Sequence, residues 1–206
     1  MADNLKNVVS FVITVDEDVD QDFISITFSA SETGPDANVV QSSLAVKLKD
    51  ALTIARPKEV AGKVEVRTGT FQINPSYDKD GAINGYQGQV FMMASGIDTI
   101  TIVELTGLIK SMNVSSVQQS VSADRRKQVE QDLAIKAIQK WREKSKTYAD
   151  AFGAASFRLI NADISFNNRF PMFRGISASA MGSGEISEEP GKDTITATIS
   201  GSIQLV

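Results

Sequence analysis

Apolar and polar residues alternate strictly in two segments near the start of the chain. A period of two predicts a β-strand with one buried face. The apolar members are Val9, Phe11, Ile13 and Val15 in the first segment and Ile24, Ile26, Phe28 and Ala30 in the second. The acidic stretch DEDVDQD between them predicts a solvated turn, so the chain is expected to open with two neighbouring strands.

The spacing then changes to three and four residues in TGPDANVVQSSLAVKLKDALTIARP. This period predicts an amphipathic helix. Pro35 and Asp36 suit its start and Pro57 suits its end. Its apolar face is expected to comprise Val40, Leu44, Leu48, Ala51 and Ala55.

Two further strand-like runs, KVEVRTGTFQINP and NGYQGQVFMMAS, are separated by SYDKDGAI. The Asp-Gly pair in that connection is typical of a β-hairpin turn. A second helix is expected after a cap at Asp98 or Thr99, with an apolar face of Ile102, Leu105, Ile109 and Met112. The stretch NVSSVQQSV then predicts a short strand.

A long helix is expected from Ser122 to a C-cap at Gly153. Its stripe steps by four and three through Ala134, Ile138, Trp141, Ser145, Tyr148 and Phe152. The favoured interpretation is that this stripe packs on a sheet, and the alternative is a ligand platform or an oligomer contact. Trp141 is the member expected to reach a partner, because its neighbours in QKWREKS are charged.

The tail predicts strands in FRLINADISF, in ISASAMGSGEIS after the loop NNRFPMFRG, and in DTITATISGSIQLV. The last run is long, β-branched and nearly uncharged, so it would promote aggregation as an unpaired edge. We therefore expect it to be paired, either inside the sheet, which we favour, or with another subunit.

The predicted order is β-β-α-β-β-α-β-α-β-β-β. There are too few helices for alternating βαβ units, which indicates an α+β fold with antiparallel sheet and about three amphipathic helices packed on it. We expect one domain over residues 1–206, with sub-lobes 1–121 and 122–206 as the alternative division.

Composition narrows the chemistry more than the fold. The 206 residues include no Cys and no His, which removes thiolate nucleophiles, His-based catalytic dyads and the commonest metal ligands. No apolar run reaches the ~20 residues of a membrane helix. The sequence therefore nominates no catalytic, cofactor-binding or metal-binding residue, and we expect no enzymatic activity and no cofactor.

Three local patterns invite a ligand and are better explained without one. Asp16, Asp18, Asp20 and Asp22 alternate like the first half of a calcium loop, but no Gly stands at its sixth position and no Glu at its twelfth. Residues 123–146 hold eight Lys/Arg against four Asp/Glu, but the chain has a net charge of −4, so we expect no nucleic-acid partner. AMGSGEIS does not match a phosphate-binding loop.

Several motifs, by their order and spacing, resemble the SIMPL-domain (YggE-like) family of bacterial envelope proteins over nearly the whole chain. They are the TGPDANVV helix entry, the run VRTGTFQINPSYD with Thr70, Pro75 and Tyr77, the strand start INGYQGQV, the helix end YADAFG and the closing PGKDTITATISGSIQLV. The helix containing QKWREKS departs from the alanine-rich helix usual in that family.

The resemblance implies an α+β fold, a place in the periplasm or cell envelope after removal of a signal peptide, homo-oligomers and a link to oxidative-stress tolerance. The expected function is thus non-enzymatic, by self-association and by binding an unknown envelope protein. The alternative is a small-ligand-binding protein or an enzyme with a carboxylate or Lys pocket.

Overall fold

The computed structural model describes residues 6–167 and 191–206, and these form two compact units. Of the described residues, unit 1 contains 6–20, 123–167 and 191–206, and unit 2 contains Gln21–Ser122. The chain passes from one unit to the other after Asp20 and again after Ser122. The expected boundary between residues 121 and 122 lies one residue from the second of these points. The first strand, however, belongs with the later part of the chain.

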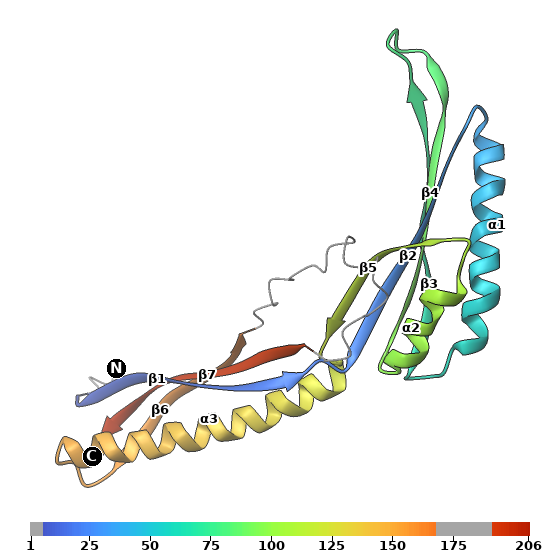
Figure 1. Ribbon diagram of the computed structural model, residues 1–206. Coiled ribbons are helices and arrows are strands. Elements are labelled where there is room, and N and C mark those ends of the chain that lie inside the picture. The colour runs from blue at the N-terminus through green and yellow to red at the C-terminus, as the bar shows by residue number, and fades with distance from the viewer. Residues whose placement is uncertain (1–5, 168–190) are drawn as a thin grey trace. The chain divides into compact units, whose positions relative to one another are not determined.

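Unit 1 is a three-stranded antiparallel sheet covered on one face by a long helix, α3 (Ala123–Ala151) (Figure 1). The strand order is β1-β7-β6, with β1 at Val8–Asp20, β6 at Phe157–Asn167 and β7 at Lys192–Leu205. The last strand of the chain is therefore central, which confirms its expected place inside a sheet. It pairs with β1 without interruption from Val8↔Gln204 to Asp20↔Lys192.

The sequence suggested that the acidic stretch forms a turn. That prediction is wrong, because β1 continues through the stretch to Asp20. Val15 and Val19 continue the buried face of the strand, while Asp16, Asp18 and Asp20 lie on the exposed face. The alternation of apolar and acidic residues thus suits a strand, and only residues 21 and 22 connect β1 to the next strand.

The buried stripe of α3 differs from the predicted one. It steps by four throughout and comprises Val129, Leu133, Ala137, Trp141, Ser145 and Ala149. Each step of four advances about 40° beyond one full turn, so the stripe winds around the helix as it follows the twisted sheet. Two of the predicted members are consequently exposed, Ile138 and, with 67% of its surface, Phe152.

Trp141 is only 3% exposed, so the prediction that it reaches a partner is wrong. Its ring stacks on Phe11 of β1, with centroids 5.1 Å apart, and Phe11 also meets the edge of Tyr148. Gly201 of β7 makes room for this cluster. A Cβ atom there would lie 3.0 Å from Cζ2 of Trp141 and 2.6 Å from the carbonyl oxygen of Asn161.

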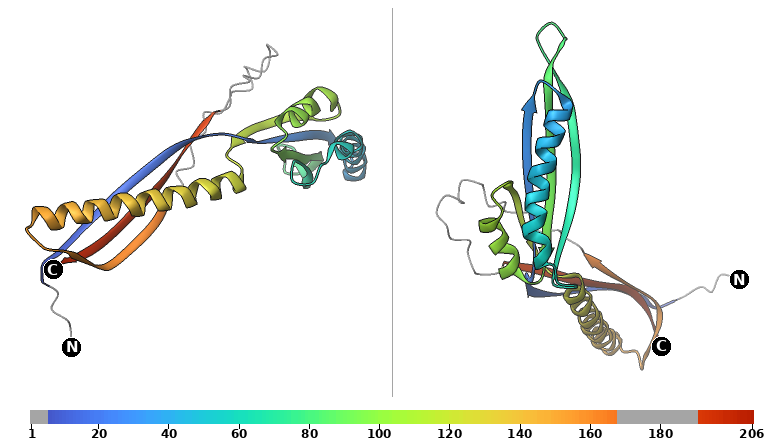
Figure 2. Two further views of the ribbon diagram at one scale, coloured as in Figure 1. Left: turned by 90° about the horizontal axis from the view of Figure 1, so that it is seen from below. Right: turned by 90° about the vertical axis from the view of Figure 1, so that its right-hand side faces the viewer.

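Unit 2 is a four-stranded antiparallel sheet in the order β3-β4-β2-β5. Its elements are β2 (Phe23–Gly34), α1 (Ala37–Ala55), β3 (Val64–Tyr77), β4 (Ile83–Gly96), α2 (Thr99–Leu108) and β5 (Asn113–Ser120). Helices α1 and α2 pack on one face of the sheet and bury the predicted apolar face of β2 (Figure 2).

Helix α1 begins and ends where the sequence indicates. The Asp36 side chain accepts hydrogen bonds from the amides of Asn38 and Val39, and Pro57 lies in the short 3₁₀ turn that follows Ala55. The helix approaches β4 closely because residue 88 is glycine. A Cβ atom there would lie 2.6 Å from Cδ1 of Leu44.

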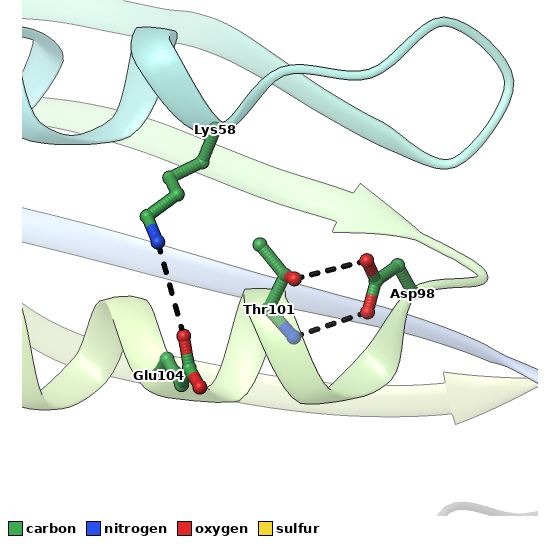
Figure 3. A network of polar contacts seen from close by, with 4 residues as sticks. All are labelled: Lys58, Asp98, Thr101 and Glu104. Atoms are coloured by element: carbon green, nitrogen blue, oxygen red, sulfur yellow. Dashed lines mark hydrogen bonds and ion pairs between the residues drawn. The ribbon is translucent and has the colours of Figure 1, made fainter.

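Helix α2 is shorter than predicted and ends at Leu108. Ile109 and Met112 follow it and are nevertheless buried, so the apolar positions were correct although the helical conformation was not. Asp98 caps the helix, accepting hydrogen bonds from the Thr101 amide at 3.2 Å and hydroxyl at 2.9 Å (Figure 3). These bonds, the amide bond first, lower the pKa of the Asp98 carboxyl below its ordinary value of 3.8.

The β3–β4 hairpin and the α+β class are confirmed, and the described elements follow the predicted order. The turn of the hairpin closes through Asp78 and Ala82, with Gly81 at a φ of 80°. The strand predicted in ISASAMGSGEIS and the loop before it lie outside the described residues.

A Gly201→Ala substitution is expected to lower the free energy of unfolding by about 1–3 kcal/mol, because the new methyl group overpacks the contact with Trp141 and the β6 backbone. Urea unfolding followed by Trp141 fluorescence measures this. Gly107→Ala is the control, because a Cβ atom there meets nothing within 4 Å and alanine favours the helix. Equal stability of Gly201→Ala and the wild type would contradict this packing.

The Asp98 cap predicts a stability difference that depends on pH. Because the folded-state pKa of Asp98 is lowered, its contribution is present above the ordinary value and is lost as the pH falls through the folded-state value. Asp98→Asn should therefore be less stable than the wild type at pH 7, and the two should converge towards pH 2.5. Urea midpoints at both pH values test this, and a difference that does not vary with pH would contradict it.

Candidate functional site

Three of the four aspartates of the acidic stretch interact with different partners. Asp18 accepts a hydrogen bond from the Thr194 hydroxyl at 2.8 Å, and Asp20 lies 4.0 Å from Lys192. Asp22 accepts two short bonds from Ser122, one from its amide and one from its hydroxyl. In the part of the chain that the structure describes, no group of three or more acidic residues is placed to hold a metal ion.

The basic residues of α3 do not form one uniform surface. Lys136 bonds to Glu17 at 2.6 Å, which raises the pKa of Lys136, and Arg126 lies 3.8 Å from the buried Asp193. Lys144 lies over the ring of Tyr148. Part of the positive charge noted in the sequence therefore holds the helix on its own sheet.

A groove of about 560 Å³ runs between α1 and the edge strand β3 in unit 2. Its walls are largely aliphatic and aromatic, and it is open to solvent. The lining residues are Ala45, Leu48, Lys49, Leu52, Thr53, Arg56, Pro57 and Phe71. A volume in this range suits a small ligand or the side chains of a bound peptide.

Phe71 reaches the groove because of a β-bulge in β3. The register slips by one residue between the pairs Thr68↔Met92 and Phe71↔Val90, so Gly69 and Thr70 both lie opposite Phe91. The slip turns Phe71 onto the side of the sheet that carries α1, where it stays 38% exposed. Glycine is needed at position 69, since a Cβ atom would lie 2.9 Å from Cβ of Phe91.

Two cations line the groove without an ion pair inside the described chain. Lys49 lies on α1, and Arg56 lies two turns further along, at the C-cap where the 3₁₀ turn begins. Lys47 differs, because it forms an ion pair with Glu32 and thereby lowers the pKa of that carboxyl. The groove therefore combines an apolar surface with positive charge that the described protein does not neutralise.

A second hollow, of about 470 Å³, is lined by a lysine and two carboxylates as well as by Phe23 and Ser95. Both carboxylates already have partners in their own chain. Glu59 accepts a hydrogen bond from the Val66 amide at 3.0 Å, and Glu65 pairs with Arg67 at 2.7 Å. An exposed ion pair, Lys58–Glu104 at 4.0 Å, joins the segment after α1 to α2 (Figure 3).

Sequence analysis missed the groove residues Lys49, Arg56 and Phe71. One signal was available for Phe71, because an isolated glycine within a strand pattern indicates a bulge. The cations resembled ordinary solvated positions of an amphipathic helix. Only the packing of α1 beside β3 brings them together with Phe71.

Comparison with known proteins agrees with the resemblance noted in the sequence. No curated protein matches the chain. Among the described residues, no helix combines the length and the apolar composition needed to cross a membrane. The profile of the SIMPL family, described as proteins of unknown function, matches residues 9–203. The match includes strands and helices of both units, and the chain therefore belongs to the SIMPL family.

Proposed function

We propose that this protein acts without catalysis, by binding through its surfaces, and that it self-associates through the edge strand β6. The observation that supports this is the incomplete cover of the sheet in unit 1. Helix α3 lies chiefly over β7 and β1. The side of β6 that faces the same way carries apolar residues that the described chain leaves open.

Three apolar side chains of β6 remain substantially exposed on this side. The exposed fraction is 55% for Leu159, 37% for Ile164 and 38% for Phe166. Their partners on β7, Ile203, Ile199 and Ala197, are buried in the core. Burial of such side chains is favourable at about 25 cal/mol per Å², so a second subunit placed here would gain stability.

The charges of β6 suit pairing with an identical strand. Arg158 and Asp163 lie opposite Gln204 and Ser200 of β7, on the face away from α3. The register of β6 slips by one residue between Leu159 and Asn161, which places Arg158 and Asp163 on the same face. In a two-fold antiparallel pair centred on this bulge, between residues 160 and 161, Arg158 lies opposite Asp163 of the partner subunit. Both copies then gain an opposite-charge pair, as a self-complementary interface requires.

The alternative is binding or conversion of a small molecule in the second hollow, beside Glu59, Lys63 and Glu65. We favour self-association because both carboxylates there already interact with the protein's own chain, whereas the apolar side chains of β6 have no cover among the described residues.

Charge reversal at either end of the β6 contact should weaken the assembly. Because a two-fold dimer contains this contact twice, either Arg158→Glu or Asp163→Arg places two pairs of like charges opposite each other. We expect the dissociation constant of the dimer to rise about tenfold, equivalent to about 1.4 kcal/mol. The combined variant R158E/D163R should restore the wild-type value. Sedimentation velocity over a range of concentrations measures all four proteins.

The control for these variants is Val46→Glu, which adds a charge at an exposed apolar position of α1 and should leave the assembly unchanged. A wild-type protein that stays monomeric at high concentration would overturn the proposal. So would failure of the double variant to recover while each single variant is folded by circular dichroism.

We further propose that the protein works in the periplasm or cell envelope and contributes to oxidative-stress tolerance, as its resemblance to envelope proteins of the family implies. We expect the native protein to appear in the periplasmic or envelope fraction and a deletion strain to survive peroxide less well. Cell fractionation and peroxide killing curves test these expectations. Recovery only with the cytoplasmic fraction would contradict the location.

A further inference from the structure

The edge of β3 is closed along its first part by the protein's own chain. Val60 exchanges two main-chain hydrogen bonds with Val64, at 3.1 and 2.9 Å. The Val66 amide donates to the Glu59 carboxylate at 3.0 Å. The main-chain groups of residues 64 and 66 therefore point away from β4, and Val60 and Glu59 act as a short substitute for a missing strand.

Along the next part of the same edge, no strand among residues 6–167 and 191–206 pairs with β3, and we call this part the open edge. Main-chain groups of an antiparallel strand point alternately to its two sides, so Thr68 also faces away from β4. Beyond the bulge, Phe71 and Ile73 pair with Val90 and Gly88, which continue the same alternation along β4. Their main-chain groups thus face the open edge as well. Pro75 is the next such position, and its lack of an N–H group ends the pairing surface.

This open edge borders the groove between α1 and β3. A peptide added beside Thr68–Ile73 would direct alternate side chains towards the helix-bearing face of the sheet, where Phe71 and Leu52 line the groove. Lys49 on α1 and Arg56 just after it lie about 10 Å apart along the helix axis. They are within reach of two carboxylates four residues apart on one face of an extended chain, which are separated by about 13 Å. A strand edge beside a helix, with a groove between them, is the geometry of peptide recognition by strand addition.

We propose that this groove binds an extended segment of another protein, in which the alternate side chains that face the helix are an apolar residue between two acidic ones. The segment adds a strand to the open edge of β3, places its apolar side chain against Phe71 and Leu52, and pairs its carboxylates with Lys49 and Arg56. The site lies on a different sheet from the self-association surface, and the proposal does not depend on that surface.

The charges of the chain itself argue against a second copy as the occupant. The groove has cations and no anion among its lining residues, so it is not self-complementary. The segment Val15–Val19 of β1 combines acids with apolar residues. Its valines are buried beneath α3 and its backbone is paired with β7, so it is not available for binding.

The test uses a defined probe, a fluorescein-labelled peptide of sequence Thr-Glu-Thr-Val-Thr-Glu-Thr, whose valine and two glutamates lie on one face of an extended chain. We expect it to bind the full chain in fluorescence anisotropy, and K49E/R56E to weaken binding at least tenfold. The matched variant K140E/R142E changes the net charge equally on α3 and should bind like the wild type. A peptide with lysine in place of glutamate should not bind.

Two further measurements identify strand addition. The probe should slow amide hydrogen exchange at Phe71 and Ile73, and methylation of every second amide of the probe should abolish binding. The Arg158→Glu variant should bind the probe normally, which separates this site from self-association. Absence of wild-type binding at 1 mM probe, or equal binding by K49E/R56E, would overturn the proposal. If these amides already exchange slowly in the protein without probe, and exchange faster when the protein is diluted, the edge of β3 binds a second copy of the chain instead.

Discussion

The width of a helix limits how much of a sheet it can bury. A helix with its side chains is about 10 Å across, and neighbouring strands lie about 4.8 Å apart, so one helix covers about two strands. Among the described residues, unit 1 has three strands and one helix over them. Leu159, Ile164 and Phe166 therefore stay exposed although they lie on the apolar side of the sheet. Unit 2 shows the same limit beside α1, where Phe71 of the outermost strand remains open to solvent.

The spacing of apolar residues was enough to predict most elements and the α+β class. A spacing of two marks a strand with one buried face, and a spacing of three to four marks a helix with one buried face. The predictions failed where two structures share the same local pattern. The acidic stretch was interpreted as a turn from its charge, yet Val15 and Val19 continue the buried face of β1 through it. The stripe of α3 was predicted for a straight helix, and the twist of the sheet shifted it towards Leu133 and Ala137.

The candidate groove could not have been predicted in the same way. It depends on a one-residue slip at Gly69 and on the close approach of α1 to Gly88, and both are long-range properties of paired strands. The slip exchanges the two faces of the second half of β3, so alternation counted from Val64 assigns Phe71 to the wrong side. Glycine marks the position of such a bulge, but only the partner strand shows that one is present.

The charge patterns of the two open surfaces indicate different kinds of partner. An interface between identical subunits must be complementary to itself, and β6 meets this condition with one cation and one anion at matching distances from a central point. The groove does not, because Lys49 and Arg56 are both positive. Pairing it with another copy of itself would bring like charges together, which is unfavourable in a partly dehydrated contact. The two proposals are therefore compatible, because assembly through the sheet of unit 1 would leave the groove of unit 2 free to bind an acidic segment of a different protein.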